Sequence, residues 1–191
     1  MGRWEPNARG RLMQAAFALY GERGFEQTTV AEIAERAGLT ERTFFRHFAD
    51  KREVLFAGAE ALQELLVSTV IGAPASLAPI DAAAVGLEAI GGFIQEGGDL
   101  ARQRQAIIAS SAELQERELI KLASLAAALA EALRQRGVGD PVASLTAEAA
   151  IAVFKVAFER YVDAANQQDL PTVIRESLDG LKVVTGGHSG D

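Results

Sequence analysis

The stretch at residues 28–48 constrains the fold of this chain most, because it specifies two short helices and the turn that joins them. Thr29 is a favourable N-cap, and Glu32 follows at the three-residue spacing of a capping box. Gly38 can adopt the positive φ that ends a helix, and Thr40 is a second N-cap shortly after it. The pattern predicts a helix-turn-helix unit.

The second helix of this unit is predicted to have two different faces. Phe44 and Phe48, and Phe45 in part, have the spacing of packing residues. Its N-terminal end and outer face carry polar and charged side chains: Glu41, Arg42, Thr43, Arg46 and His47. A helix end with free N–H groups and arginines suits the phosphate-lined groove of DNA, so this helix is the candidate DNA-binding element.

A third N-cap, Asp50, predicts a long helix that runs to the region of Val70, with Glu53 again at capping-box spacing. Lys51 would then lie in the first helical turn, where a cation opposes the helix dipole. That placement is compatible with a partner outside the helix, such as a phosphate. A solvated surface lysine is the alternative.

These residues resemble a known family. Residues 37–55, AGLTERTFFRHFADKREVL, are similar to the recognition-helix signature of the TetR family of bacterial transcriptional repressors. Residues 9–25, ending in YGERGF, resemble the first helix of that family, and residues 28–34 resemble its second. The resemblance implies an all-α fold, with an N-terminal three-helix DNA-binding domain followed by a C-terminal helical bundle for ligand binding and dimerisation.

The resemblance also implies roles for single residues. Glu41 and Arg42 open the recognition helix, where base edges are usually contacted. Phe45 departs from the family pattern, which often has a tyrosine there whose hydroxyl touches a phosphate. Thr43, His47 and Lys51 fall where contacts to the DNA backbone are usual, and Thr29 lies at the start of the preceding helix, another phosphate-contacting place. The predicted DNA-binding residues are Thr29, Thr40, Glu41, Arg42, Thr43, Phe45, Arg46, His47 and Lys51.

Each of these roles has a structural alternative that the sequence leaves open. Arg42 and Arg46 could be solvated only, and Glu41 could serve only the helix dipole. His47 could be a partly buried residue that orients its neighbours without touching DNA.

The charge of the chain is divided unevenly between its two ends. The net charge is −7 over 191 residues, which argues against a protein that binds nucleic acid over its whole surface. Residues 1–60 carry nine basic and nine acidic side chains, whereas residues 61–191 carry ten and seventeen. The division favours docking on DNA through the N-terminal end.

Composition excludes several classes of protein. The chain has no cysteine, which excludes disulfides and thiolate metal sites and is compatible with a reducing cytoplasm. Neither a signal-peptide pattern nor a long charge-free apolar stretch occurs, so we expect a cytoplasmic protein without a membrane partner. The two histidines lie at positions 47 and 188, and no catalytic, metal or cofactor motif is present, so a helical enzyme is disfavoured.

Further helices are predicted from periodicity, caps and breakers, at residues 7–24, 82–96, 100–113, 116–136, 141–168 and 171–184. A Gly/Pro/Ser-rich linker separates the long helix from the next one at residues 71–79. The predicted division is a DNA-binding domain at 1–56, a regulatory and dimerisation domain at 57–185, and a disordered tail at 186–191.

The last two helices are candidates for a homodimer interface. Apolar residues recur at helical spacing in both of them: Ala147, Ala150, Ile151, Phe154, Phe158 and Tyr161, then Val173, Ile174, Leu178 and Leu181. These stripes could close the protein's own core or pair with a second copy. The family resemblance favours a homodimer through about residues 142–184 that binds a palindromic operator in double-stranded DNA.

The segment at residues 82–133 is rich in Ala, Leu and Ile, and such a bundle can enclose an apolar pocket. By resemblance, a small apolar or aromatic effector bound there would release a repressor from its operator. Polar residues that could orient the effector, or could equally be plain surface, are Gln95, Arg102, Gln103, Gln105, Ser110, Ser111 and Lys155. A packed core without a pocket is the alternative, and a DNA-binding activator or architectural protein without a ligand is the alternative function.

Overall fold

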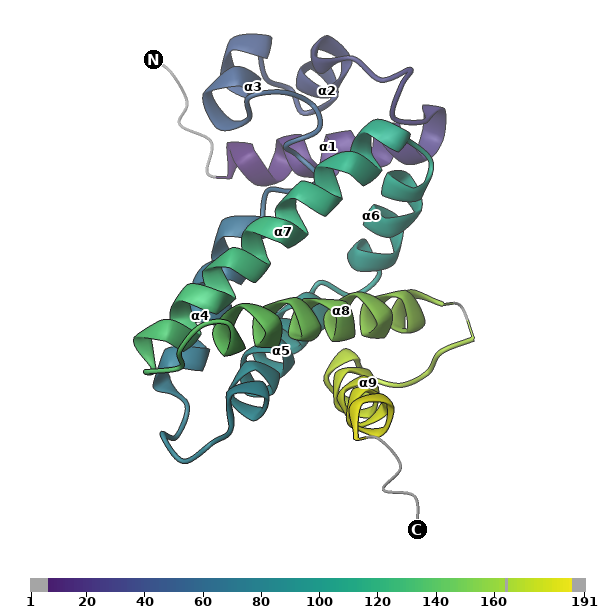
Figure 1. Ribbon diagram of the computed structural model, residues 1–191. Helices are drawn as coiled ribbons and strands as arrows, with labels where there is room; N and C mark the ends of the chain where they lie inside the picture. The colour runs from purple at the N-terminus through teal and green to yellow at the C-terminus, as the bar shows by residue number, and fades with distance from the viewer. Residues whose placement is uncertain (1–6, 164, 187–191) are drawn as a thin grey trace. The chain divides into compact units, whose positions relative to one another are not determined.

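The structure is a computed structural model that describes residues 7–163 and 165–186 (Figure 1). Within these residues the chain forms nine α-helices and no strand, which confirms the all-α prediction. The helices belong to two compact units. Unit 1 is formed by the described residues of Met1–Ala59 and Arg102–Glu118, and unit 2 by those of Glu60–Ala101 and Leu119–Asp191. The predicted disordered tail lies outside the described residues, apart from Gly186.

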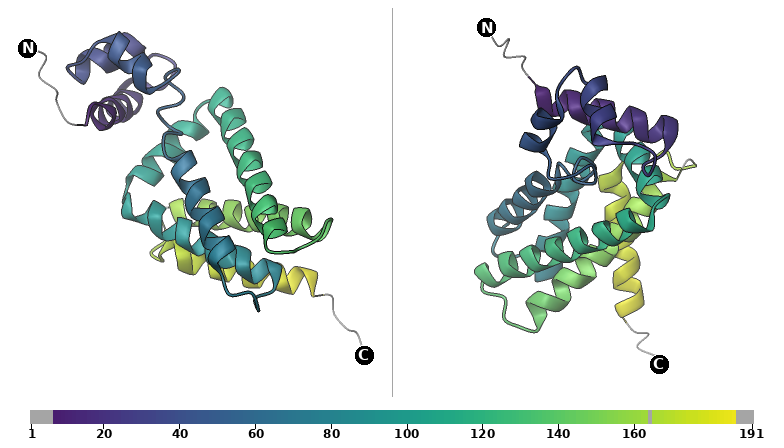
Figure 2. Two further views of the ribbon diagram at one scale, coloured as in Figure 1. Left: turned by 90° about the vertical axis from the view of Figure 1, so that its left-hand side faces the viewer. Right: turned by 90° about the horizontal axis from the view of Figure 1, so that it is seen from above.

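Unit 1 is built on three helices, α1 (Ala8–Arg23), α2 (Val30–Arg36) and α3 (Glu41–His47), and both short helices pack on α1 (Figures 1 and 2). Phe25, Ile33 and Phe44 are fully buried at their junction. Tyr20 and Phe25 meet edge to face, with 5.3 Å between the ring centroids. The apolar stripe predicted for the helix-turn-helix therefore forms the core of this unit.

A segment from far along the chain completes unit 1. It holds most of α6 (Leu100–Ala109) and the beginning of α7 (Ala112–Gln135). Ile108 and Leu114 of this segment are fully buried in the same core as Phe44. Ion pairs of 2.5 Å join Arg52 to Glu113 and Arg117 to Glu53. The predicted DNA-binding domain, residues 1–56, did not include this segment.

The helix predicted to start at Asp50 begins later, as α4 (Ala59–Gly72), so this prediction was wrong. Residues 51–58 form turns instead, with hydrogen bonds over three residues such as Leu55 N–H to Arg52 O. The consecutive residues Val54, Leu55 and Phe56 are all buried in the core of unit 1. Asp50 still caps the first turn, because its carboxylate accepts from the N–H groups of Arg52 and Glu53.

Unit 2 contains α4, α5 (Pro79–Glu96), the rest of α7, α8 (Val142–Val162) and α9 (Leu170–Thr185). Helices α5, α8 and α9 pack against one another around Ile90, Ala150 and Ile174. Gly91 permits the close approach of α5 and α9, since a Cβ there would lie 2.8 Å from Cδ1 of Ile174. Arg136 closes the end of α4, because its guanidinium donates to the carbonyl of Val70 in the last turn and to those of Ala73 and Pro74 after the helix.

Several helix ends differ from the predicted ones. Helix α5 starts at Pro79, ahead of the predicted cap Asp81, because proline suits the first helical position. The predicted helix at 100–113 ends at Ala109, and the next begins at Ala112. Helix α8 ends at Val162, well before residue 168. No helix among residues 7–163 and 165–186 has the length and apolar character needed to cross a membrane.

Candidate nucleic-acid interface

The start of α2 is fixed by the capping box that the sequence predicted. The Thr29 hydroxyl accepts from the Glu32 N–H at 3.3 Å, and the Glu32 carboxylate accepts from the Thr29 N–H at 2.9 Å. Arg23 of α1 forms an ion pair of 2.7 Å with the same carboxylate. These bonds hold the pKa of Glu32 below its usual value, first through the backbone N–H of Thr29 and then through its hydroxyl and the charge of Arg23.

The turn between α2 and α3 depends on Gly38, whose φ of +66° lies in the left-handed region. The Leu39 N–H donates to Ala34 O and the Gly38 N–H to Glu35 O, so the last carbonyls of α2 are satisfied. Arg11 of α1 donates to Ala37 O and so stabilises the turn from the side of α1. The turn therefore sets the angle between the two short helices.

Helix α3 has the two faces that the sequence predicted. Thr40 is its N-cap and accepts from the Thr43 N–H at 3.2 Å. Phe44 and Phe48 face the core, at 0% and 4% exposure, whereas Phe45 is 55% exposed. The Phe45 ring stands at 84° to Phe44, with centroids 5.5 Å apart. One face of α3 is thus locked into unit 1, and the other is presented to solvent.

The outer face of α3 carries basic groups that acidic side chains do not neutralise. Glu41, Arg42 and Arg46 are exposed, and Thr43 and His47 are half-buried. Within the described part of the chain, Arg42 makes no hydrogen bond or ion pair. Arg46 approaches only the His47 ring, with 3.5 Å between Nη2 and Nε2.

Other arginines of unit 1 are already engaged within the protein. Arg23 pairs with Glu32 and Arg36 pairs with Glu22, both on the outer surface of α1 and α2. Further arginines bind carboxylates or backbone carbonyls, namely Arg9, Arg11, Arg52, Arg104 and Arg117. The charges of Arg42 and Arg46 on α3 are therefore available to an anionic partner such as DNA phosphate.

Lys51 differs from the other predicted contact residues in where the structure places it. Its ammonium group donates to the backbone carbonyls of Phe25, Glu26 and Thr28, at 2.9, 3.3 and 2.9 Å. It also lies over the Phe25 ring, 4.3 Å from the centroid. These partners lie more than twenty residues away in the chain, so the sequence around Lys51 could not have indicated them.

Comparison with known proteins agrees with this architecture. Residues 12–57 match the family model described as "Bacterial regulatory proteins, tetR family", and residues 77–185 match the model described as "MftR C-terminal domain". The chain belongs to the TetR family. This family is one of bacterial transcriptional regulators of the helix-turn-helix type and not one of enzymes.

Curated relatives of this TetR-family protein are all matched over part of their length. The chain is 36% identical to the transcriptional regulator TcmR of Streptomyces glaucescens over 47% of this chain and 39% of TcmR. It is 43% identical to the repressor KstR2 of Mycobacterium tuberculosis over 25% of this chain and 24% of that protein. It is 36% identical to the activator FasR of Mycolicibacterium smegmatis over 32% of this chain and 28% of that protein.

Solved structures match the TetR-family fold over nearly the whole chain. The SmeT–triclosan complex has a TM-score of 0.67 at 20% identity and covers 93% of this chain and 90% of that one. A TetR-family regulator from Syntrophomonas wolfei has a TM-score of 0.69 at 16% identity, covering 95% and 96%. At these identities, the likeness establishes that this chain has the same fold as each of these proteins, and it does not establish a shared ligand.

The predicted effector region contains polar side chains that mostly serve the protein's own backbone. Gln95 Oε1 accepts from the Leu170 N–H, and Gln103 donates to Phe17 O. Ser110 donates to Ile107 O, and Ser111 donates to Glu26. Gln105 differs, because its Oε1 atom is buried and has no hydrogen-bond partner among the described residues.

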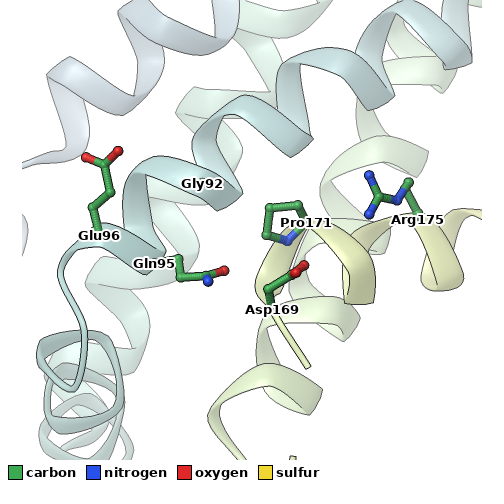
Figure 3. A pocket seen from close by; sticks show the side chains of 6 residues that line it. All are labelled: Gly92, Gln95, Glu96, Asp169, Pro171 and Arg175. Atoms are coloured by element: carbon green, nitrogen blue, oxygen red, sulfur yellow. The ribbon is translucent and has the colours of Figure 1, made fainter. Parts of the chain in front are cut away.

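Unit 2 has a surface hollow of about 370 Å³ where α5 meets the start of α9, lined by Gly92, Gln95, Glu96, Asp169, Pro171 and Arg175. Figure 3 shows Gln95 beside Asp169 and Pro171, which is where it caps α9. Asp169 is itself the N-cap of α9, and Arg175 pairs with Glu88 at 3.0 Å. Gln95, Asp169 and Arg175 are engaged within the protein, and the hollow lies at the surface, so it differs from the enclosed apolar pocket that the sequence predicted.

Proposed function

We propose that this protein is a repressor that binds a palindromic DNA operator as a homodimer through α3 and is released by a small effector. One observation carries the DNA contact. Arg42 and Arg46 are exposed on α3 without an acidic partner among the described residues, whereas neighbouring arginines on α1 and α2 are paired. A helix that presents such a face from a rigid core fits the major groove.

The proposed contacts divide by their chemistry. Arg42, at the start of α3, has the geometry to donate to the O6 and N7 atoms of guanine, and Glu41 can accept from the amino group of cytosine. The exposed edge of Phe45 suits a thymine methyl group, because it is apolar and its ring is held by Phe44. Thr29, Thr40, Thr43, Arg46 and His47 are proposed to contact the DNA backbone.

The DNA-binding proposal is tested by selecting bound sequences from a random DNA library and measuring affinity for the selected site. Arg42→Ala should weaken binding by roughly 1–3 kcal/mol and relax the preference at one base pair. Arg46→Ala should weaken all sequences alike and lower the salt dependence by about one unit per domain. Arg175→Ala, an exposed arginine of unit 2, is the control that should change neither quantity.

Two results would count against the proposed DNA contacts. Equal affinity and unchanged base preference in the Arg42→Ala variant would remove Arg42 from the contact surface. Failure of the wild-type protein to enrich any DNA sequence would remove the proposal itself.

The proposed dimer interface lies on exposed apolar positions of α8 and α9. The stripes that the sequence analysis singled out are largely buried in the protein's own core, including Ala147, Ala150 and Ile174. A second stripe of α8 has alternating three- and four-residue spacing and lies outside this core, with Ala149 half-buried and the others exposed: Val142, Leu145, Ala149, Ala152 and Val156. Leu145 is 66% exposed, and Val183 and Val184 of α9 are 78% and 82% exposed.

Alternating three- and four-residue spacing is the pattern by which helices of two chains pack along a shared seam. The Leu145→Glu variant should therefore be a monomer in light scattering at micromolar concentration, with its helical content unchanged. Leu119→Glu, the same change at a leucine of α7 that is 58% exposed, is the matched control and should stay dimeric. The dimer proposal would be falsified if the wild-type protein were a monomer at that concentration while binding its operator.

The effector part of the proposal is supported by two observations of different kinds. SmeT, a structural neighbour, is described in complex with triclosan, a small molecule. In this chain, Gln105 Oε1 is buried without a donor among the described residues, and a bound molecule with an N–H or O–H group would satisfy it. We propose Gln105 as an effector contact.

Screening apolar and aromatic molecules for loss of operator binding tests the effector. Gln105→Leu should weaken the effective molecule while leaving operator affinity without it unchanged, because the leucine cannot accept a hydrogen bond. Transcription from the selected operator, measured with and without the protein, separates a repressor from an activator. Higher transcription in the presence of the protein would favour the activator, a function that the relative FasR carries in its name.

A further inference from the structure

The ammonium group of Lys51 is saturated by the protein's own backbone. A lysine ammonium has three N–H donors. In this structure they meet three carbonyl oxygens, those of Phe25, Glu26 and Thr28, at 2.9, 3.3 and 2.9 Å. The charge also lies 4.3 Å from the centre of the Phe25 ring, a favourable cation–π distance. No donor of Lys51 is left for a phosphate in this arrangement.

The carbonyl groups that accept hydrogen bonds from Lys51 belong to the turn between α1 and α2. The turn closes locally through the Thr28 hydroxyl, which donates to Gly24 O at 2.9 Å, and through the Thr28 N–H, which donates to Phe25 O. Thr28 is buried at 1% exposure, so its carbonyl has little access to water. Three carbonyl dipoles directed at one point repel each other unless a cation lies there.

The backbone of Lys51 is held from the other side of the turn. The Tyr20 hydroxyl donates to Lys51 O at 2.6 Å, and the Tyr20 ring packs on Phe25. Burial raises the pKa of Tyr20, with a smaller contribution from the charge of Asp50, so this hydroxyl stays protonated and remains a donor. Lys51 is therefore fixed at its backbone by α1 and fixes the turn with its side chain.

We propose that Lys51 is a positioning residue for DNA binding, which acts by holding the turn at residues 24–28 and through it the start of α2. The inference rests on the proposed DNA-binding surface. Thr29, the N-cap of α2 and a proposed phosphate contact, directly follows the Thr28 carbonyl that Lys51 binds. A shift of this turn moves the N–H groups at the start of α2 away from the DNA backbone.

Two variants of Lys51 and one of Arg46 test this in the full-length protein. Lys51→Met keeps an apolar stem over Phe25 and removes the donors, and Lys51→Arg restores donors and charge. Arg46→Ala is the matched control, since it removes an exposed cation of α3 that binds no backbone carbonyl among the described residues. Hydrogen exchange in the free protein and operator affinity against salt are measured at a temperature where circular dichroism shows each variant folded.

Lys51→Met should speed hydrogen exchange at residues 24–33 and weaken operator binding about tenfold, or about 1.4 kcal/mol, because the N–H groups at the start of α2 move away from the DNA backbone. The salt dependence of binding should stay at the wild-type value, and Lys51→Arg should recover most of the affinity. Arg46→Ala should show the opposite pattern, with normal exchange and a salt dependence reduced by about one unit per domain.

Two results would overturn the inference. A reduced salt dependence with normal exchange in Lys51→Met would make Lys51 a direct phosphate contact. Faster exchange with wild-type operator affinity would show that the turn does not position any DNA contact. If the wild-type protein bound no operator at all, the proposed function would fail as well, and the exchange data would still show whether Lys51 holds the turn.

Discussion

The substitution Gly38→Ala places a side chain at the turn on which the geometry of α2 and α3 depends. Gly38 has a φ of +66°, and an added Cβ would lie 2.8 Å from Nη2 of Arg11. Arg11 can swing away, because that nitrogen is the end of a flexible side chain, but it then loses its bond to Ala37 O. The substitution thus combines backbone strain with the loss of a brace.

The size of the effect follows from these two contributions. A residue with a Cβ in the left-handed conformation costs roughly 1–2 kcal/mol. A hydrogen bond from a charged donor contributes about 1.5 kcal/mol at the lower end of its range, which is appropriate because Arg11 is half-buried. Together they predict a loss of about 2.5–3.5 kcal/mol in the free energy of unfolding. For a chain of this length that corresponds to a decrease in melting temperature of roughly 5–14 °C.

Thermal unfolding by circular dichroism measures the effect, and Gly92→Ala provides the matched control. Gly92 lies in the interior of α5, and a Cβ there would meet nothing within 4 Å. The same chemical change should therefore stabilise the protein at this position, by about 0.5–1 kcal/mol. Operator affinity should decrease for Gly38→Ala, because the angle between α2 and α3 changes, and should be unaffected for Gly92→Ala.

A melting temperature in Gly38→Ala that is unchanged, or raised as in Gly92→Ala, would refute the reasoning. It would mean that the turn adopts another conformation without loss, and that Gly38 does not set the geometry of the helix-turn-helix.

Two further predictions concern charged groups outside α3. The Thr29 N–H, the Thr29 hydroxyl and Arg23 lower the pKa of Glu32 in the folded protein. The stabilisation from Glu32 is therefore fully present above the ordinary carboxyl pKa, about 4.3, and is lost as the pH falls through the lower pKa of the folded state. The melting temperature of Glu32→Gln should therefore be below that of the wild type at pH 7, and the two should converge in acid. A constant difference in melting temperature across that pH range would contradict the assignment. Arg136→Met should destabilise unit 2 by roughly 1.5–3 kcal/mol in denaturant unfolding, because three backbone carbonyls lose a charged donor. Arg134→Met, whose guanidinium binds exposed Asp140, is its control and should change stability by less than about 1 kcal/mol.

The helix caps and the turn of the helix-turn-helix could be predicted from the sequence. The Thr29 capping box, the positive φ at Gly38 and the Thr40 cap all occur as expected. Each of these features depends on groups within about four residues of one another, so the sequence contains all the participants. The division of α3 into a buried and an exposed face follows in the same way from helical spacing.

The helix predicted at Asp50 failed for a reason that lies outside its own sequence. The caps at Asp50 and Glu53 satisfied the local rules, and Asp50 does cap a turn. Glu53 binds Arg117, and Val54, Leu55 and Phe56 are all buried in unit 1. Partners more than sixty residues away in the chain determined the conformation of this segment.

The sequence by itself determined the helices of the DNA-binding surface, their caps and the arginines of α3, because those properties arise from neighbours along the chain. Only the tertiary structure decided which groups remain available for a partner. It joined residues 102–118 to unit 1, buried the apolar stripe of α8 that seemed suited to a dimer, and engaged Lys51 with three carbonyls of a distant turn. Burial and saturation of a donor depend on the path of the whole chain, and no local pattern around a residue encodes them.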